Sequence, residues 1–121
     1  MWVGSGPIYY RSREAWILQL PNVTKAAHTF GGTEFQVQGL EFVHTHGTSH
    51  LDIRLSSEDQ ERILKEGKAE PPRFGPPAGW VTFRIRSEGD VDAAKELIRL
   101  SCDDAQNMMA PHSLRRFQKN G

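Results

Sequence analysis

Two histidines, His44 and His46, stand two positions apart in a segment whose residues alternate like those of a β-strand. Side chains at that spacing point to the same face of a strand, as paired imidazole ligands do in metal-binding strands. His28 would lie a few residues beyond this pair if the intervening chain forms a hairpin. Three imidazoles can bind Zn²⁺ and leave a fourth position for water, which is the arrangement of a catalytic zinc site. One hypothesis is therefore a metal-dependent enzyme that uses His28, His44 and His46.

The same histidines also have a simpler interpretation. By alternation they share a face with Leu40 and Phe42, which predicts that they point toward the helices. There they would be partly buried imidazoles that hydrogen-bond to the backbone or to an acid such as Glu41. We therefore favour a non-catalytic binding or interaction domain without a cofactor, whose ligand is an unidentified small molecule or protein. The candidate ligand-binding residues around this pocket are His28, Phe42, His44, His46 and Trp80.

Three arginines suggest a second alternative, a nucleic-acid-binding module. Arg54, Arg84 and Arg86 would lie on the solvent face of the sheet, where guanidinium groups could bind a phosphate backbone. Trp80 has the same parity and could stack on a base. However, Asp52 shares that face, and the 15 basic residues of the chain are balanced by 15 acidic ones. A protein without net charge has no general attraction for nucleic acid, which disfavours this alternative.

The residues before the histidines predict a hairpin with a defined register. Residues 34–37 alternate between polar and apolar side chains, as expected for a half-buried strand. Gln38-Gly39 suits a two-residue turn, because glycine adopts the positive φ that such turns require. A turn at this place would pair Phe35 with Phe42 on the apolar face of the sheet.

The other segments predict the rest of an α+β domain. Helices are expected over residues 8–20, 57–66 and from 90 onward, strands over 51–55 and 80–86, and loops over 22–29 and 70–79. The order is α-β-β-β-α-β-α, with a single antiparallel sheet of about four strands and helices on one face. At 121 residues we expect a single domain, 1–121, with its core over about residues 8–104 and a polar, basic tail over 105–121.

Other reactive or phosphate-binding residues give no further hypothesis. Cys102 falls on the apolar face of the last helix, which predicts a core residue rather than a nucleophile. Gly31-Gly32 precedes a strand instead of a helix N-terminus, so it predicts a close backbone approach or a bulge rather than a phosphate cradle. The single cysteine, the absence of a secretion signal and the absence of a long apolar run predict a cytoplasmic protein without membrane contact. An exposed edge strand could support a homodimer.

Short motifs across residues 15–103 give the chain a family resemblance. They are His28-Thr29-Phe30-Gly31-Gly32, His44-Thr45-His46-Gly47, Gly67-Lys68-Ala69-Glu70-Pro71, Gly79-Trp80-Val81 and Leu97-Ile98-Arg99-Leu100-Ser101. In combination they resemble the small bacterial proteins of the luciferase domain family. More distantly, the order of elements is similar to TfoX N-terminal and MmcQ/YjbR-like double-wing domains. These resemblances imply an α+β fold, and the residues supply no flavin, peroxide or luciferin site.

Overall fold

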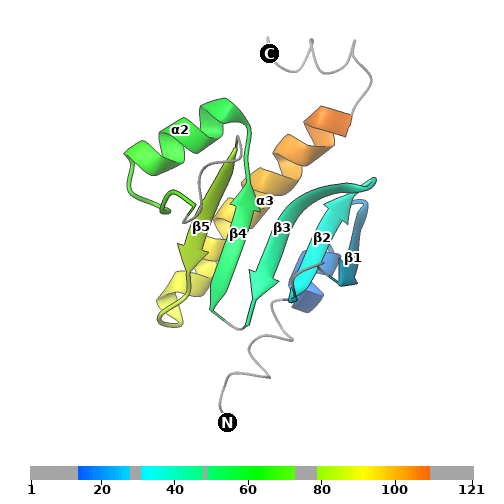
Figure 1. Cartoon of the computed structure of the whole chain (residues 1–121), viewed down its shortest axis with the longest axis horizontal. Helices are drawn as coiled ribbons and strands as arrows, with labels where there is room; N and C mark the ends of the chain where they lie inside the picture. The colour runs from blue at the N-terminus through cyan, green and yellow to red at the C-terminus, as the bar shows by residue number, and fades with distance from the viewer. Residues whose placement is uncertain (1–13, 28–30, 48, 73–78, 110–121) are drawn as a thin grey trace.

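A computed structural model shows a five-stranded antiparallel sheet with a long helix crossing behind it (Figure 1). It describes residues 14–27, 31–47, 49–72 and 79–109. The strands lie side by side in chain order, as β1 (Val23–Ala27), β2 (Thr33–Val37), β3 (Leu40–His46), β4 (His50–Arg54) and β5 (Trp80–Arg84). Helix α2 (Ser57–Lys65) separates β4 from β5, and α3 (Gly89–Met109) follows β5. The predicted α+β class and single antiparallel sheet are confirmed.

Strand β1 is the element that the sequence pattern did not reveal. A loop was predicted over residues 22–29, but Val23–Ala27 pairs along its whole length with β2. Four of these five residues are exposed, so the segment has no alternation of buried and exposed side chains. Such alternation is the signal by which a half-buried strand is recognised, and without it an edge strand resembles a polar loop.

The hairpin between β2 and β3 contains a bulge that was not predicted. The turn itself is as expected, because Gln38 and Gly39 have φ angles of 51° and 85°, which fits a two-residue hairpin turn. The register then shifts between Phe35 and Gln36, so that Phe35 pairs with Val43 instead of Phe42. A bulge of this kind places two residues of one strand opposite one residue of the other.

The bulge reverses the face on which the histidines lie. Phe42 and Val43 are consecutive and both fully buried, so the alternation of β3 is interrupted between them. His44 and His46 consequently point away from the core, to the face of the sheet that no described helix covers. We call this the open face. The prediction that the two histidines share a face with Leu40 and Phe42 was wrong, since one extra residue inverts every later position of a strand.

The core lies between the other face of the sheet and α3. Buried residues of α3 recur at helical spacing on one side of the helix, as Ala94, Leu97, Ile98, Ser101, Cys102 and Ala105. Ile17, in a helical turn over residues 14–18, is buried in the same core. Helix α3 continues past Asp104 to Met109. Within the described part of the chain, no helix combines the length and apolarity that a bilayer span needs.

The bulge is fixed from behind by α3. The hydroxyl oxygen of Ser101, which is fully buried, lies 3.1 Å from the carbonyl oxygen of Phe42 and also within hydrogen-bonding reach of the Arg54 carbonyl. A bulge locally disrupts the hydrogen-bond ladder, so a buried carbonyl there needs another donor. Ser101 lies in position to be that donor, and its single hydroxyl proton can go to either the Phe42 or the Arg54 carbonyl oxygen.

The close backbone approach predicted for Gly31-Gly32 is confirmed, and a second glycine, Gly67, ends α2. A Cβ atom on Gly32 would lie 1.9 Å from the carbonyl oxygen of Thr45, so the backbones of these residues approach as closely as only glycine allows. Gly67, with a φ of 73°, follows the last turn of α2, and its amide donates to the Leu64 carbonyl oxygen at 3.1 Å. The start of the same helix is capped by Ser56, whose hydroxyl accepts from the Asp59 amide at 3.1 Å.

Candidate functional site

Strand pairing brings polar side chains from four strands together in rows on the open face. The first row is Glu34, His44, Asp52 and Thr82, and the second is His46, His50 and Arg84. Neighbouring strands lie about 4.8 Å apart, so side chains within a row can contact one another directly. Among the described residues, the site is therefore built by the register of the strands.

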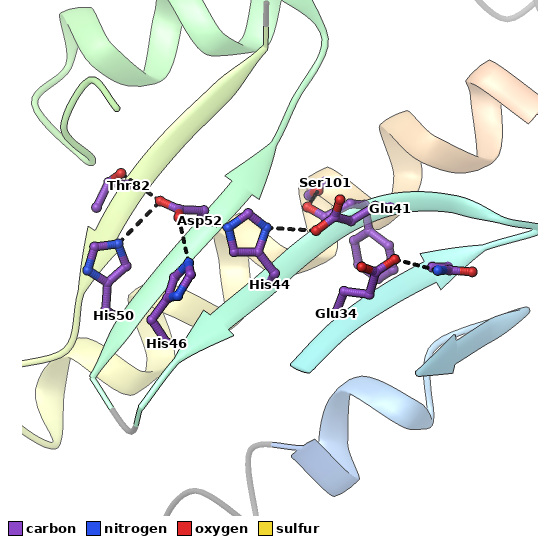
Figure 2. Close-up of polar contacts among 10 residues, drawn as sticks. Glu34, Glu41, His44, His46, His50, Asp52, Thr82 and Ser101 are labelled. Atoms are coloured by element: carbon purple, nitrogen blue, oxygen red, sulfur yellow. Dashed lines mark hydrogen bonds and ion pairs between the residues drawn. The ribbon is translucent and has the colours of Figure 1, made fainter. Parts of the chain in front are cut away.

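Asp52 is the centre of this arrangement (Figure 2). Its Oδ2 atom lies 2.9 Å from Nε2 of His44 and 3.2 Å from Nε2 of His46. Its Oδ1 atom accepts a hydrogen bond from the Thr82 hydroxyl at 2.7 Å and lies 3.4 Å from Nε2 of His50. Two imidazole nitrogens thus converge on one carboxylate oxygen, while Thr82 and His50 hold the other.

His44 lies between two carboxylates. Its Nδ1 is 2.7 Å from Oε2 of Glu41, and its Nε2 faces Asp52. Burial alone lowers the pKa of His44, but the hydrogen bonds and charges of Asp52 and Glu41 outweigh it, so the pKa is raised. Burial likewise favours a higher pKa for Asp52, yet the hydrogen bonds from His44 and Thr82 hold the pKa of that carboxyl far below its usual range. Asp52 is therefore a carboxylate at neutral pH.

The hydrogen-bonding roles of the two His50 nitrogens follow from its neighbours. Nη1 of Arg84 lies 3.3 Å from Nδ1 of His50. A guanidinium group has only donors, so Nδ1 is the acceptor in this contact and Nε2 is the nitrogen that carries a proton. That nitrogen can then donate to Oδ1 of Asp52. His50 consequently links the guanidinium of Arg84 to the carboxylate of Asp52.

Aromatic rings surround the central carboxylate. The ring centroids of His44 and His46 are 4.7 Å apart and those of His46 and His50 are 5.1 Å apart, both nearly edge to face. The Trp80 ring lies 5.2 Å from that of His44 at an interplanar angle of 43°. Trp80 therefore borders the cluster on the side of His44, and Arg84 borders it on the side of His50.

Three of the five predicted ligand-binding residues come together here, namely His44, His46 and Trp80. Phe42 does not join them, because it is fully buried on the core side of the sheet. His28 lies outside the described residues. The predicted pocket between the helices and the histidines was wrong, since these histidines face away from the helices. Asp52, His50 and Thr82 were not predicted as site residues, and correct knowledge of the β3 register would have found the first of them opposite His44.

The central atoms are spaced as metal ligands. One ligand atom from each of His44, His46 and Asp52 lies within 4.8 Å of the other two. A tetrahedral ion about 2.1 Å from each ligand would separate neighbouring ligand atoms by about 3.4 Å. The observed separations of 2.9 and 3.2 Å are close to that value. Two imidazoles and a carboxylate are a common ligand set for zinc and for other divalent transition metals.

The chain matches the family model described as Luciferase domain over residues 39–101, which is more than half of its length. It belongs to the luciferase domain family. The match in this luciferase domain begins at the hairpin turn and ends at Ser101, so it contains every residue of the two polar rows except Glu34. The predicted family resemblance is thus confirmed. No curated protein matches the chain.

The arginines of the luciferase domain extend the cluster toward β5. Arg84 Nε lies 3.8 Å from Oε1 of Glu70, and Arg86 Nη2 lies 3.9 Å from Oε2 of the same residue. These separations exceed hydrogen-bond length, so both are loose ion pairs. Arg54 pairs with Trp80 across β4 and β5, also on the open face. The predicted positions of Arg54 and Arg84 in the sheet are correct, whereas Arg86 lies beyond the end of β5, which was predicted to reach residue 86. Nucleic-acid binding by the three arginines stays a prediction.

Proposed function

We propose that this luciferase domain binds a divalent transition-metal ion of the zinc type on the open face of its sheet. His44, His46 and Asp52 are the ligands. The observation that carries the proposal is the convergence of two imidazole Nε2 atoms on Oδ2 of Asp52, at 2.9 and 3.2 Å. The ligand set replaces His28, which the sequence hypothesis used, with a carboxylate from the neighbouring strand.

A second set of contacts orients the ligands in the way that metal sites require. Glu41 engages Nδ1 of His44 and so leaves Nε2 for the ion, and Thr82 engages Oδ1 of Asp52 and so leaves Oδ2. Outer carboxylates and hydroxyls of this kind fix the orientation of ligating groups and raise their basicity. Metal binding would replace the proton that His44 Nε2 shares with Asp52, so binding should release protons.

The test is a titration of protein purified without a histidine tag. We expect about one equivalent of Zn²⁺ per chain, measured by elemental analysis and by competition with a coloured chelator. Asp52→Asn keeps an oxygen that can accept from Thr82 but removes the charge, and it should weaken Zn²⁺ binding at least tenfold. Asp103→Asn, at an exposed position on α3, is the matched control and should bind as the wild type does. Equal affinity in the two variants would exclude Asp52 as a ligand.

A second candidate function is metal-dependent hydrolysis. This function is favoured by the number of protein ligands, because three of them leave a fourth position on the ion for water. A bound ion lowers the pKa of that water, which makes it a nucleophile near neutral pH. The site also lies on the open face, where a substrate could approach it. Hydrolysis of an activated ester such as p-nitrophenyl phosphate should then require Zn²⁺ and be abolished in Asp52→Asn. If the protein binds Zn²⁺ but does not hydrolyse the ester, the hydrolase function is ruled out and metal binding remains as the proposed function.

A further inference from the structure

The metal ligands have a row of cationic side chains beside them. Arg84 is separated from Asp52 by a single imidazole, since His50 lies 3.3 Å from Arg84 through Nδ1 and 3.4 Å from Asp52 through Nε2. Arg86 lies just beyond the end of β5, and its guanidinium group faces the same Glu70 carboxylate as that of Arg84. The side chains of Arg84 and Arg86 are 38% and 70% exposed, which leaves guanidinium donors available to a ligand.

Glu70 is a weak partner for both arginines. Its two carboxylate oxygens lie 3.8 and 3.9 Å from the nearest guanidinium nitrogens, and its side chain is 56% exposed. Exposed ion pairs without hydrogen-bond contact contribute little and exchange readily for a better partner. The backbone of Glu70 is held independently, through two 2.8 Å hydrogen bonds to Thr82. Its carboxylate could therefore leave the arginines without disturbing the sheet.

The charge balance of the open face changes when a metal ion binds. The open face carries four acids, Glu34, Glu41, Asp52 and Glu70, against the three arginines Arg54, Arg84 and Arg86. A divalent ion adds two positive charges and so changes the sum of these charges from negative to positive. Anion binding should therefore depend on the metal, and the anion should in turn strengthen metal binding by the same factor.

Resting on the proposed metal site, we propose that the ligand completing it is a phosphate group. One phosphate oxygen occupies the open position of the metal, and the others accept hydrogen bonds from Arg84 and Arg86 in place of Glu70. Guanidinium groups match phosphate geometry, and a tetrahedral dianion can contact the ion and two guanidinium groups together, whereas a carboxylate has only two oxygens. Trp80 bounds the cluster on the opposite side, so the phosphate lies over His50, between the metal and the arginines.

Two variants should shift phosphate binding in opposite directions. Arg84→Gln removes a charge-assisted donor and should raise the dissociation constant for phosphate about tenfold, while its amide can still donate to His50. Glu70→Gln removes the competing carboxylate and should lower that constant. Arg62→Gln, on α2, removes an arginine that forms ion pairs with Asp59 and Glu66, and it is the matched control.

The experiment uses the full chain loaded with Co²⁺, whose visible absorption bands respond to a change of ligand at the ion. We expect inorganic phosphate to change the spectrum until the site is saturated. The dissociation constant obtained in this way should rise in Arg84→Gln, fall in Glu70→Gln and stay unchanged in Arg62→Gln. Phenyl phosphate in a parallel titration distinguishes an esterified phosphate from the free ion, by which of the two binds more tightly. Acetate should bind much more weakly than either.

The outcomes separate this inference from the proposed function. If the protein binds Co²⁺ but phosphate leaves the spectrum unchanged, the phosphate inference is wrong and the metal site stands. If Co²⁺ does not bind, the metal proposal fails and the phosphate inference fails with it. Equal phosphate affinity in Arg84→Gln and Arg62→Gln, or acetate binding as tight as phosphate binding, would each overturn the recognition that we assign to the arginines.

Discussion

Oε2 of Glu41 lies 2.7 Å from Nδ1 of His44, which leaves only Nε2 of that ring directed at Asp52. The contact spans three positions of one strand, and the bulge at Phe42 makes it possible by bringing both side chains to the open face. In a regular strand, residues three apart point to opposite faces. The bulge thus creates the carboxylate–imidazole pair on which the proposed metal site depends.

Replacement of Glu41 by glutamine tests this pair. Gln retains an oxygen that can accept from Nδ1 but loses the negative charge, so the pKa of His44 should fall toward that of a free imidazole. Zn²⁺ affinity should decrease about tenfold, as is typical for loss of an outer carboxylate. The pKa can be followed by NMR titration of the His44 ring in protein stripped with a chelator. An unchanged His44 pKa would show that Glu41 does not interact with this ring in solution.

Removal of the metal should lower thermal stability. A ligand that binds only the folded state stabilises it by about 2.7 kcal/mol at a free concentration of 100 times its dissociation constant. For a domain of this size that corresponds to a rise of roughly 10 °C in the unfolding midpoint, which a chelator should reverse. Calorimetry of Asp52→Asn and Asp103→Asn, each with and without Zn²⁺, should show the full rise in Asp103→Asn and at most about half of it in Asp52→Asn.

The pH dependence of stability should reveal a half-buried carboxyl group on α3, that of Asp104. Burial raises the pKa of Asp104 to about 6, reinforced by the Asp59 carboxyl, although the Ser56 amide donates to it at 2.9 Å. The folded pKa lies above the unfolded one, so folding binds the proton more tightly. The resulting stabilisation is fully present below about pH 4 and is lost as the pH rises through 6.

Asp104→Asn should remove this pH dependence. The amide oxygen of Asn can still accept from Ser56, and the variant should be about 1 kcal/mol more stable than the wild type at pH 7, a value reduced for the solvent that reaches this half-buried group. Urea unfolding at several values between pH 4 and pH 7 measures the difference. A wild type that gains stability relative to Asp104→Asn as the pH rises would contradict the assigned direction.

Adjacent glycines before β2 allow a matched test of the β2–β3 pairing. Gly31 and Gly32 both have positive φ angles, of 95° and 82°, but only at Gly32 would a Cβ meet another atom, the Thr45 carbonyl oxygen. Gly31→Ala should therefore show the conformational cost alone, about 1 kcal/mol. Gly32→Ala should cost several kcal/mol more, because the backbone of β3 must move. Similar losses in the two variants, measured by chemical unfolding, would argue against the close approach to Thr45.

The sequence determined the turn of the hairpin but not the register beyond it. Gln38-Gly39 specifies the turn by the φ angles that glycine permits, whereas the bulge falls at Phe42 and Val43, two apolar residues of which either could face the core. A shift of one residue in the strand pairing there moves His44 and His46 from the core face of the sheet to the open face. Strand β1 was not predicted because most of its residues are exposed. Asp52 was not predicted as a site residue because its partner, His44, was assigned to the core face of the sheet. By contrast, the buried face of α3 was predictable, since each of its members follows the helical period.

In the proposed site, His44, His46 and Asp52 hold a metal ion on the open face. Crystals of the protein with Zn²⁺, measured on both sides of the zinc absorption edge, test it most directly. We predict one anomalous peak about 2.1 Å from Nε2 of both histidines and from Oδ2 of Asp52. An anomalous peak at other residues, or none in crystals grown with saturating Zn²⁺, would contradict the proposal.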